Sequence, residues 1–190
     1  MKVELENVKP MDIEKRSFEI ITEELGDTPL IPGTELVVKR CIHTSADFDY
    51  AKNLCFSENA VEKAIQAIKD GACIVTDTQM AKAGINKRAL ARYGGEVYCF
   101  MSDEDVAKIA KENGSTRATA SMDKAAGLDK KLDPELIIGV PVGFVNVVQS
   151  KELIMHTEVP YIVARGRKGG SNIAACICNA LLYMIDNNRG

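Results

Sequence analysis

The 190-residue sequence contains no apolar run long enough to cross a membrane and no paired cysteine motif. A membrane span needs about 18 or more apolar residues in a row. No signal-peptide stretch occurs in the amino-terminal MKVELENVKP. The six cysteines form no C-x-x-C pair and only two histidines could join them, which disfavours a zinc site. We therefore expect no metal, and we interpret the cysteines as reduced thiols of a soluble, cytoplasmic protein.

Neither sign of charge dominates the chain, and the common phosphate-binding motifs are missing. There are 24 Lys and Arg residues against 27 Asp and Glu residues, a net charge of −3. This balance leaves no face-wide basic excess of the kind that nucleic-acid-binding proteins carry. Neither G-x-x-x-x-G-K-[ST] nor G-x-G-x-x-G occurs, so nucleotide binding has little support. We expect no cofactor, no nucleic-acid partner and no membrane partner.

What is present is the composition of an ordinary globular domain. Hydrophobic residues make up 46% of the chain and charged residues 27%. A chain of this length buries roughly 70% of the surface that its unfolded form exposes, so it needs no disulfide or metal to fold. No internal repeat and no linker composition interrupts it. We predict a single domain over residues 1–190.

The amino-terminal third of the chain has a helical pattern. Residues 11–26, MDIEKRSFEIITEELG, place their large apolar side chains on one stripe and end with Gly26, a common residue at a helix C-terminus. After the turn at TPLIPG, a second helix is predicted over residues 34–44. A third is predicted from a cap at Ser57 to a stop at Gly71.

Short apolar runs then alternate with helical patterns. Each run ends at a turn signal, as strands that are buried on both faces do. The helical patterns include residues 102–114, with Ser102 as the predicted cap, and residues 171–188. This alternation predicts an α/β fold of three layers, a mostly parallel sheet with helices on both faces, preceded by a helical N-terminal extension. The predicted strands are CIVTD (73–77), VYCFM (97–101), LIIGVP (136–141) and YIVAR (161–165).

A glycine-rich basic segment follows the last predicted strand. Ligands of open α/β sheets bind outside the carboxyl ends of the strands, where this chain has RGRKGG, residues 165–170, here named the basic turn. The basic turn leads into the N-terminus of a predicted helix, whose amides and dipole favour an anion. Glycines let the backbone approach a ligand, and arginines suit carboxylate or phosphate. We favour an anion site over the alternative, a solvated loop whose charges aid solubility.

His43 is the candidate for proton transfer. It ends an apolar helical face and enters the polar stretch TSADFD. Histidine titrates near neutral pH and is the usual choice for general acid–base work. On these residues alone, a structural role for a single histidine stays open. His156 is interpreted as structural, because it lies near the end of a predicted helix, where it meets the C-terminal dipole.

Two further polar residues have two interpretations each. Asp77, between Thr76 and Thr78, either caps the following helix or contacts a ligand. Arg117 falls in the first turn of a helix, where a positive charge is mildly unfavourable. Contact with an anionic ligand would explain Arg117, and an exposed, solvated arginine is the alternative. The residues thus indicate an α/β domain that binds a polyanionic small molecule, with His43 as a candidate acid or base.

Five stretches taken together resemble the precorrin-8X methylmutase family of cobalamin biosynthesis. The resemblance runs in the same order from about residue 10 to the C-terminus, and the histidine segment, PVGFV and RGRKGGS are specific in combination. It implies a flavodoxin-like sheet and a homodimer whose ligand pockets lie near the subunit interface. The stretches are IHTSADFDYA, IVTDTQMAKAGI, STRATASM, PVGFVNVVQSKELI and VPYIVARGRKGGSNIAACICNALL.

The resemblance also implies the reaction. Members of this family are isomerases that move a methyl group from carbon 11 to carbon 12 of precorrin-8X or cobalt-precorrin-8, a 1,5-sigmatropic shift that gives hydrogenobyrinic or cobyrinic acid. No methyl donor takes part. The substrate is a tetrapyrrole-derived ring with acetate and propionate arms, whose carboxylates suit the basic turn.

Matching positions imply the site. His43 corresponds to the catalytic position, expected to donate a proton or hydrogen bond to the ring. The residues expected to bind substrate are Arg165, Gly166, Arg167, Lys168, Gly169, Arg117, Thr76, Thr78 and Ser17. Two other functions remain as alternatives: a non-catalytic corrinoid-binding carrier and, with less support, an α/β enzyme acting on a phosphate ligand.

Overall fold

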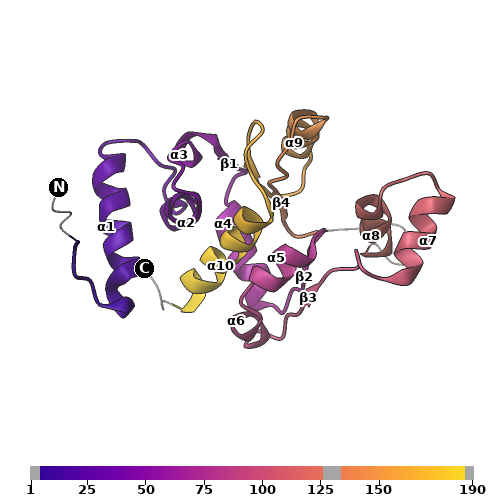
Figure 1. Ribbon diagram of the computed structural model, residues 1–190, viewed down its shortest axis with the longest axis horizontal. Helices are drawn as coiled ribbons and strands as arrows, with labels where there is room; N and C mark the ends of the chain where they lie inside the picture. Colours follow the sequence, from indigo (N-terminus) through magenta and orange to yellow (C-terminus); the bar gives the residue numbers. More distant parts are fainter. Residues whose placement is uncertain (1–4, 126–133, 187–190) are drawn as a thin grey trace.

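The computed structural model describes residues 5–125 and 134–186 (Figure 1). Its strands are β1 (Leu54–Phe56), β2 (Ile74–Val75), β3 (Val97–Tyr98), β4 (Ile137–Gly139) and β5 (Tyr161–Ala164). A short 3₁₀ turn at Pro10–Asp12 precedes the first α-helix. The helices are α1 (Ile13–Leu25), α2 (Glu35–Ser45), α3 (Tyr50–Asn53), α4 (Ala60–Lys69), α5 (Gln79–Gly84), α6 (Lys87–Ala91), α7 (Glu104–Glu112), α8 (Arg117–Ala125), α9 (Val147–Met155) and α10 (Ser171–Asp186).

All four predicted strands are present, and they pair in parallel as expected. Strand β4 pairs with β5, and β2 pairs with β3. The strands form two hydrogen-bonded sets, one of order β1-β5-β4 and one of β2 with β3. Strand β1 was not predicted and runs antiparallel to β5, with Cys55 opposite Val163. The expected mixed α/β class with a small, mostly parallel sheet is thereby confirmed.

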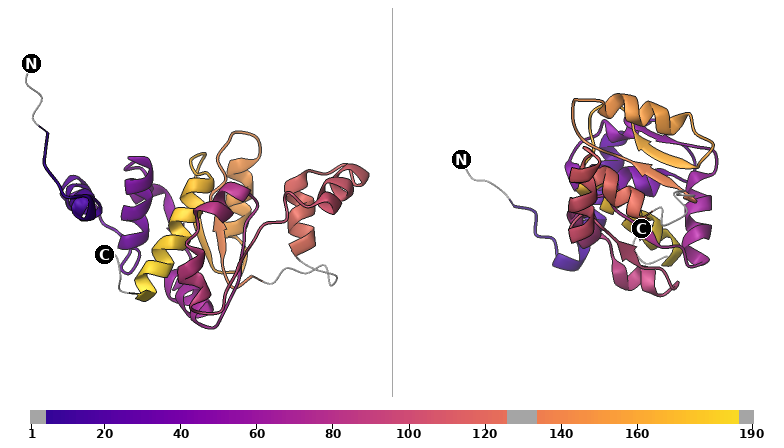
Figure 2. Two further views of the ribbon diagram at one scale, coloured as in Figure 1. Left: turned by 60° about the horizontal axis from the view of Figure 1, so that its bottom comes forward. Right: turned by 90° about the vertical axis from the view of Figure 1, so that its right-hand side faces the viewer.

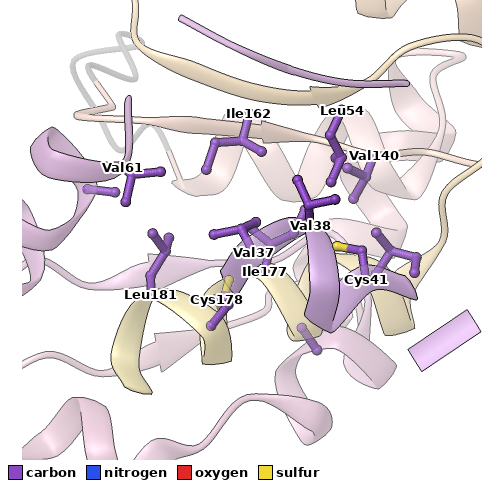
Figure 3. Close-up of a cluster of buried hydrophobic side chains, with 14 of the residues drawn as sticks. Val37, Val38, Cys41, Leu54, Val61, Val140, Ile162, Ile177, Cys178 and Leu181 are labelled. Carbon is purple, nitrogen blue, oxygen red and sulfur yellow. The ribbon is translucent and has the colours of Figure 1, made fainter. Parts of the chain in front are cut away.

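Helix α10 is the central packing element. It packs against α2, α4 and α5 (Figure 1). Its predicted start at Ser171 is confirmed, and it is described to Asp186, so the last two predicted residues lie outside the described part. Figure 3 shows its inner residues facing the sheet and α2. Burying a Val, Leu or Ile side chain fully stabilises a fold by about 1.5–3 kcal/mol. This apolar cluster includes Val37, Val38, Cys41, Leu54, Val61, Val140, Ile162, Ile177, Cys178 and Leu181.

The predicted helical extension at the N-terminus is confirmed. Helix α1 ends at Gly26, whose φ of 51° is easily adopted by glycine and whose N–H donates to the carbonyls of Thr22 and Glu23. Helix α2 follows after the predicted turn and packs against both α1 and α10. Helix α2 therefore lies between α1 and α10, and its last turn carries His43.

Two predicted helix caps are wrong, because each serine binds a distant element instead. Ser57 does not cap α4, which begins at Ala60 after Asn59. The Ser57 hydroxyl accepts a hydrogen bond from the backbone N–H of Tyr161 at 2.9 Å, which ties the end of β1 to β5. Ser102 does not cap α7, since its hydroxyl accepts a hydrogen bond from the Gln79 side chain at 3.1 Å.

Helices α7 and α8 form a pair that projects from the rest of the molecule (Figure 2). They pack on one another through a small apolar cluster of their own, made of Val106, Ala110 and Ala120. The helix predicted to stop at Gly114 does end there, since α7 closes at Glu112 and Gly114 has a φ of 60°. Within the two described ranges, no helix is both long and apolar enough to cross a bilayer.

Candidate functional site

The basic turn connects β5 to the N-terminus of α10, as predicted. Its glycines take backbone conformations that other residues rarely adopt, with φ of 82° at Gly166 and 152° at Gly169. A Cβ atom on Gly169 would lie 2.1 Å from the carbonyl oxygen of Val140. The backbone of the basic turn therefore packs directly on the end of β4, an approach that only glycine permits.

Lys151 supports the basic turn through hydrogen bonds to its backbone. This role was not predicted from the sequence. Its side chain is fully buried on α9. The Lys151 ammonium donates hydrogen bonds to the carbonyl oxygens of Gly166 at 2.8 Å and Lys168 at 2.7 Å. Burial lowers the pKa of this ammonium below its ordinary value. The one available signal was its place four residues after Val147 and three before Ile154 on an apolar helix.

Lys168 joins the basic turn to the segment that follows His43. Its ammonium lies 2.6 Å from the Asp47 carboxylate and 2.5 Å from the Asp49 carboxylate. These two hydrogen-bonded carboxylates raise the pKa of Lys168 to about 12. In turn, the hydrogen bond from Lys168 lowers the pKa of Asp47 below its ordinary value. The predicted anion-binding turn and the predicted catalytic segment are thus held side by side.

The two arginines of the basic turn have different surroundings. Arg165 donates two hydrogen bonds to the Glu152 carboxylate, at 2.8 and 3.0 Å, so its charge is already matched. The guanidinium of Arg167 lies over the ring of Phe144 at 5.2 Å. Among the cations of the basic turn, Arg167 is the one that forms no ion pair with a described residue.

His43 lies exposed in the last turn of α2, against a side chain from α1. Its ring stacks on Phe18, with centroids 5.7 Å apart and planes inclined by 22°. Behind this stack is Arg40, which is 7% exposed and lies between the rings of Phe18 at 5.3 Å and Tyr183 at 4.6 Å. Arg40 also pairs with Glu14 at 2.6 Å. Helix α1 therefore limits the orientations open to the imidazole.

Thr78 and Thr76 follow β2 and reach the same end of α10. Thr78 caps α5 by accepting a hydrogen bond from the N–H of Ala81, and its hydroxyl donates to Ser171 at 2.9 Å, at the start of α10. Thr76 is buried and bonds the carbonyls of Tyr98 and Thr78. Of the two interpretations of Asp77, capping is wrong, because Thr78 is the cap.

The remaining predicted residues lie in different places. Ser17 is on α1, next to Phe18, and its hydroxyl donates to the carbonyl of Ile13 at 2.9 Å. Arg117 is the first residue of α8, and this helix lies well away from α2 and the basic turn in both figures (Figures 1 and 2). His156 lies at the predicted helix end, just after α9, with Nδ1 2.6 Å from the Glu152 carbonyl oxygen.

Within one chain, contacts join His43 to Phe18, the segment after His43 to the basic turn, and Thr78 to the start of α10, whereas Arg117 lies apart on α8. A cavity of about 430 Å³ lies elsewhere, by the α1–α2 connection, and is lined by Leu30, Val38 and Leu54 among others. None of the predicted site residues lines that cavity, so we place the site on the open face between α2 and the basic turn. No cluster of His, Cys, Asp and Glu suited to a metal ion occurs in the part of the chain that the structure describes.

Comparisons with known proteins identify the family of the chain. A family profile described as precorrin-8X methylmutase matches residues 12–132 and 127–184. The chain is 41% identical to the cobalt-precorrin-8 methylmutase of Salmonella typhimurium, over 93% of this chain and 96% of that relative. It is 40% identical to the protein of that name from Leptospira interrogans, over 94% and 95%.

A solved structure shares the fold. The precorrin-8X methylmutase from Thermus thermophilus, known from a crystal analysis, superposes with a TM-score of 0.78 at 32% identity. The match covers 94% of this chain and all of that one. Together with the family profile, this match confirms the family resemblance.

Proposed function

The chain belongs to the precorrin-8X methylmutase family, and from this premise we propose how its residues perform the reaction. It is an isomerase of cobalamin biosynthesis that moves a methyl group from carbon 11 to carbon 12 of precorrin-8X or cobalt-precorrin-8. The product is hydrogenobyrinic or cobyrinic acid. Because the methyl group stays within one tetrapyrrole-derived molecule, the reaction needs no methyl donor.

We propose that His43 is the catalytic residue. Its imidazole is exposed in the last turn of α2, and the segment that follows it is ion-paired with Lys168 of the basic turn. An imidazole supplies a proton or hydrogen bond near neutral pH. Donation to the ring draws electron density from the carbon that receives the methyl group. General acid help of this kind contributes about 10²- to 10⁴-fold in rate. The remainder comes from holding the ring in a reactive geometry.

The carboxylate arms of the substrate bind, in this proposal, at the basic turn. Arg167 supplies a guanidinium without an ion-pair partner among the described residues, and the N-terminus of α10 adds the positive end of its dipole. Thr78 donates a hydrogen bond to Ser171 at the start of α10, and Ser17 is next to Phe18, whose ring stacks on His43. The single observation that supports the assignment is the pairing of Lys168 with Asp47 and Asp49, which joins the basic turn to the segment that follows His43.

The His43→Ala variant tests the catalytic role. We expect turnover to fall by about 10²- to 10⁴-fold, because the proton donor is lost, while the product still binds. His156→Ala is the matched control, since the second histidine lies at the end of α9. Turnover is followed by visible absorption, because forming the corrin changes the chromophore. A normal rate in His43→Ala would show that the assignment is wrong.

A non-catalytic corrinoid carrier is not favoured, because the matched family and its relatives are named methylmutases. Incubating excess substrate with little protein separates the two functions. Many conversions per chain are expected for the enzyme, and one or none for a carrier. Running metal-free and cobalt-bearing substrate separately shows in the same assay which form is preferred.

We further propose that the protein acts as a homodimer in which Arg117 of one copy reaches the site of the other. Two observations support this: α8 lies far from His43 within one chain, and large apolar side chains are exposed beside the basic turn. Exposed apolar patches often mark protein interfaces. Between β4 and α9 these side chains are Val142, Phe144 and Val145, which are 64%, 78% and 84% exposed.

Three inferences, on the sheet arrangement, the domain and the cellular location, complete the proposal. The parallel pairs β4–β5 and β2–β3 belong to one flavodoxin-like, three-layer arrangement, with helices on both faces. The chain functions as one domain over residues 1–190. It works in the cytoplasm, an inference supported by six cysteines that are all free thiols, as expected in a reducing compartment.

A further inference from the structure

Lys151 is a buried cation that the mechanism above does not use. Removing a charge from water is costly unless hydrogen bonds compensate it. The Lys151 side chain is 0% exposed, and its compensation comes from two carbonyl oxygens, those of Gly166 and Lys168. Both belong to the basic turn. An apolar residue would fill this position on α9 at lower cost, so the charge calls for a functional explanation.

The two hydrogen bonds fix the orientation of two peptide planes. Every described peptide bond is trans, and in a trans peptide the carbonyl and the following N–H point in opposite directions. Since the carbonyls of Gly166 and Lys168 point toward Lys151, the N–H groups of Arg167 and Gly169 point away from it. Lys151 therefore turns two amide donors toward the outer side of the basic turn.

These two donors are unused within the described ranges. Neither the Arg167 N–H nor the Gly169 N–H donates to an acceptor among residues 5–125 and 134–186. The amides of Gly166 and Lys168 likewise donate to no acceptor in these ranges, whereas those at the two ends of the basic turn do, Gly170 to Val140 and Arg165 to Asn53. Backbone N–H groups that lack an acceptor in the protein are donors for an anion. The positive charge of Lys151 beneath them strengthens the same field.

Most side-chain charge of the basic turn is already committed. Arg165 is paired with Glu152, and Lys168 with Asp47 and Asp49. A carboxylate that approaches the basic turn can therefore contact Arg167 and the two outward amides directly. The charges of Arg165 and Lys168 attract it only weakly, because their carboxylate partners screen them. The backbone N–H groups are therefore the donors that remain to orient the bound carboxylate.

We propose that Lys151 is a positioning residue for substrate binding, which holds the basic turn so that the amides of Arg167 and Gly169 bind a carboxylate arm of the ring. The inference rests on the proposed function, which supplies the carboxylate-bearing ligand. Lys151 itself touches no reacting atom. It acts through the backbone that it orients, so its loss affects binding more than the chemical step.

The first test is the Lys151→Met variant, which keeps length and removes the charge and its donors. We expect the Kd for hydrogenobyrinic acid and the KM to rise roughly 10- to 100-fold, because two hydrogen bonds to a charged group are weakened. The kcat at saturating substrate changes little, because His43 is untouched. Lys63→Met, at an exposed lysine on α4, is the matched control and leaves Kd and KM as in the wild type.

The second test needs no variant. Hydrogenobyrinic acid is added to the ¹⁵N-labelled wild-type protein, and the amide signals of Arg167 and Gly169 are followed by NMR. We expect both amide protons to shift downfield on binding, whereas the Gly94 amide, which donates to the Ala91 carbonyl away from the basic turn, stays in place. This readout reports the amides themselves, and a carboxylate arm bound by side chains alone would leave them unmoved.

The outcomes separate the two proposals. If the wild-type protein converts substrate while the two amides do not respond to product, the role of Lys151 and the amides is wrong and the methylmutase function stands. If Lys151→Met lowers kcat and leaves Kd and KM unchanged, the positioning role in binding is also wrong. Failure of the wild-type protein to isomerise either form of the substrate overturns the proposed function instead.

Discussion

His43 takes its surroundings from side chains far along the sequence. Phe18 stacks on it from α1, and Arg40 lies behind Phe18, held by Glu14 and by the ring of Tyr183. Aromatic pairs of this kind are worth about 0.5–1.5 kcal/mol beyond the area that they bury. The imidazole thus has one face on protein and one face open, an arrangement suited to a flat ring arriving from outside.

The ion pair of Asp47 with Lys168 makes stability depend on pH in a defined direction. The folded pKa of Asp47 is lowered, so its contribution is present above the unfolded value of about 3.9 and is lost as pH falls through the lower folded value. We expect Asp47→Asn to lower the Tm at pH 7 by no more than about 4 °C, as partly exposed pairs are weak. As the pH falls through the folded pKa of Asp47, the difference in Tm between the variant and the wild type disappears.

Thermal melts over a pH series check this expectation. Asp27→Asn, at an exposed aspartate that follows α1, is the control and keeps the wild-type profile. An equal decrease in Tm for Asp47→Asn at every pH would contradict the ion-pair explanation.

The helices and strands show which features of the fold can be predicted from the sequence and which cannot. The helix at residues 11–26 and the run YIVAR were predicted, because their apolar periodicity and glycine stops are local signals. Strand β1 was missed, because three residues are too short for a periodic signal and its antiparallel partner lies about a hundred positions away. Ser57 was misassigned for a related reason, since its hydroxyl binds the backbone of Tyr161.

The same limit explains what was missed in the site. The composition of RGRKGG alone led to the prediction of an anion-binding turn, and its placement before α10 was predicted as well. Lys151 carries no such signal, because its partners are carbonyl oxygens 15 and 17 residues away that only the folded turn brings to it. The sequence also did not reveal which cations of the basic turn are free to bind a ligand. Arg165 pairs with Glu152, 13 residues away, and only the folded structure shows this pair.

The close contact between the basic turn and β4 predicts a difference between two glycines. Gly169→Ala forces a Cβ to within 2.1 Å of the Val140 carbonyl oxygen, whereas nothing lies within 4 Å of a Cβ on Gly166. Gly166→Ala carries only the conformational strain of positive φ, about 1–2 kcal/mol. We expect Gly169→Ala to lose more stability and more product binding than Gly166→Ala, as measured by urea unfolding and absorbance titration. Equal losses would show that the backbone contact does not matter.

On the scale of the whole molecule, the α7–α8 pair separates one predicted binding residue from the others. Arg117 lies on this pair, while His43 and the basic turn lie on the body (Figures 1 and 2). A cyclic dimer places the same two surfaces in contact twice, so a residue that projects from one copy can complete the site of the other. The exposed Phe144 and its apolar neighbours provide a surface for that contact.

Mixing two inactive variants tests the shared site. If Arg117 serves the other copy, hybrids of His43→Ala and Arg117→Ala contain one intact site in two, and hybrids are half of all dimers after 1:1 exchange. We therefore expect about a quarter of the wild-type activity to return on mixing. Each variant alone, taken through the same exchange, is the control. No recovery, with exchange verified by mass spectrometry, would place Arg117 in the site of its own chain.

The small cluster of Val106, Ala110 and Ala120 has a consequence for motion. Local free energies of opening follow the contacts that hold each unit. The α7–α8 pair has this small cluster, with Phe100 and Ile109 packed against it and Lys124 paired with Asp103 and Asp105, whereas the cluster around α10 is extensive. The pair can therefore unravel while the body remains folded. The amide protons of α7 and α8 would then exchange with solvent through opening of this pair alone. A ligand that binds Arg117 would order the α7–α8 pair, and part of its selectivity would come from that ordering.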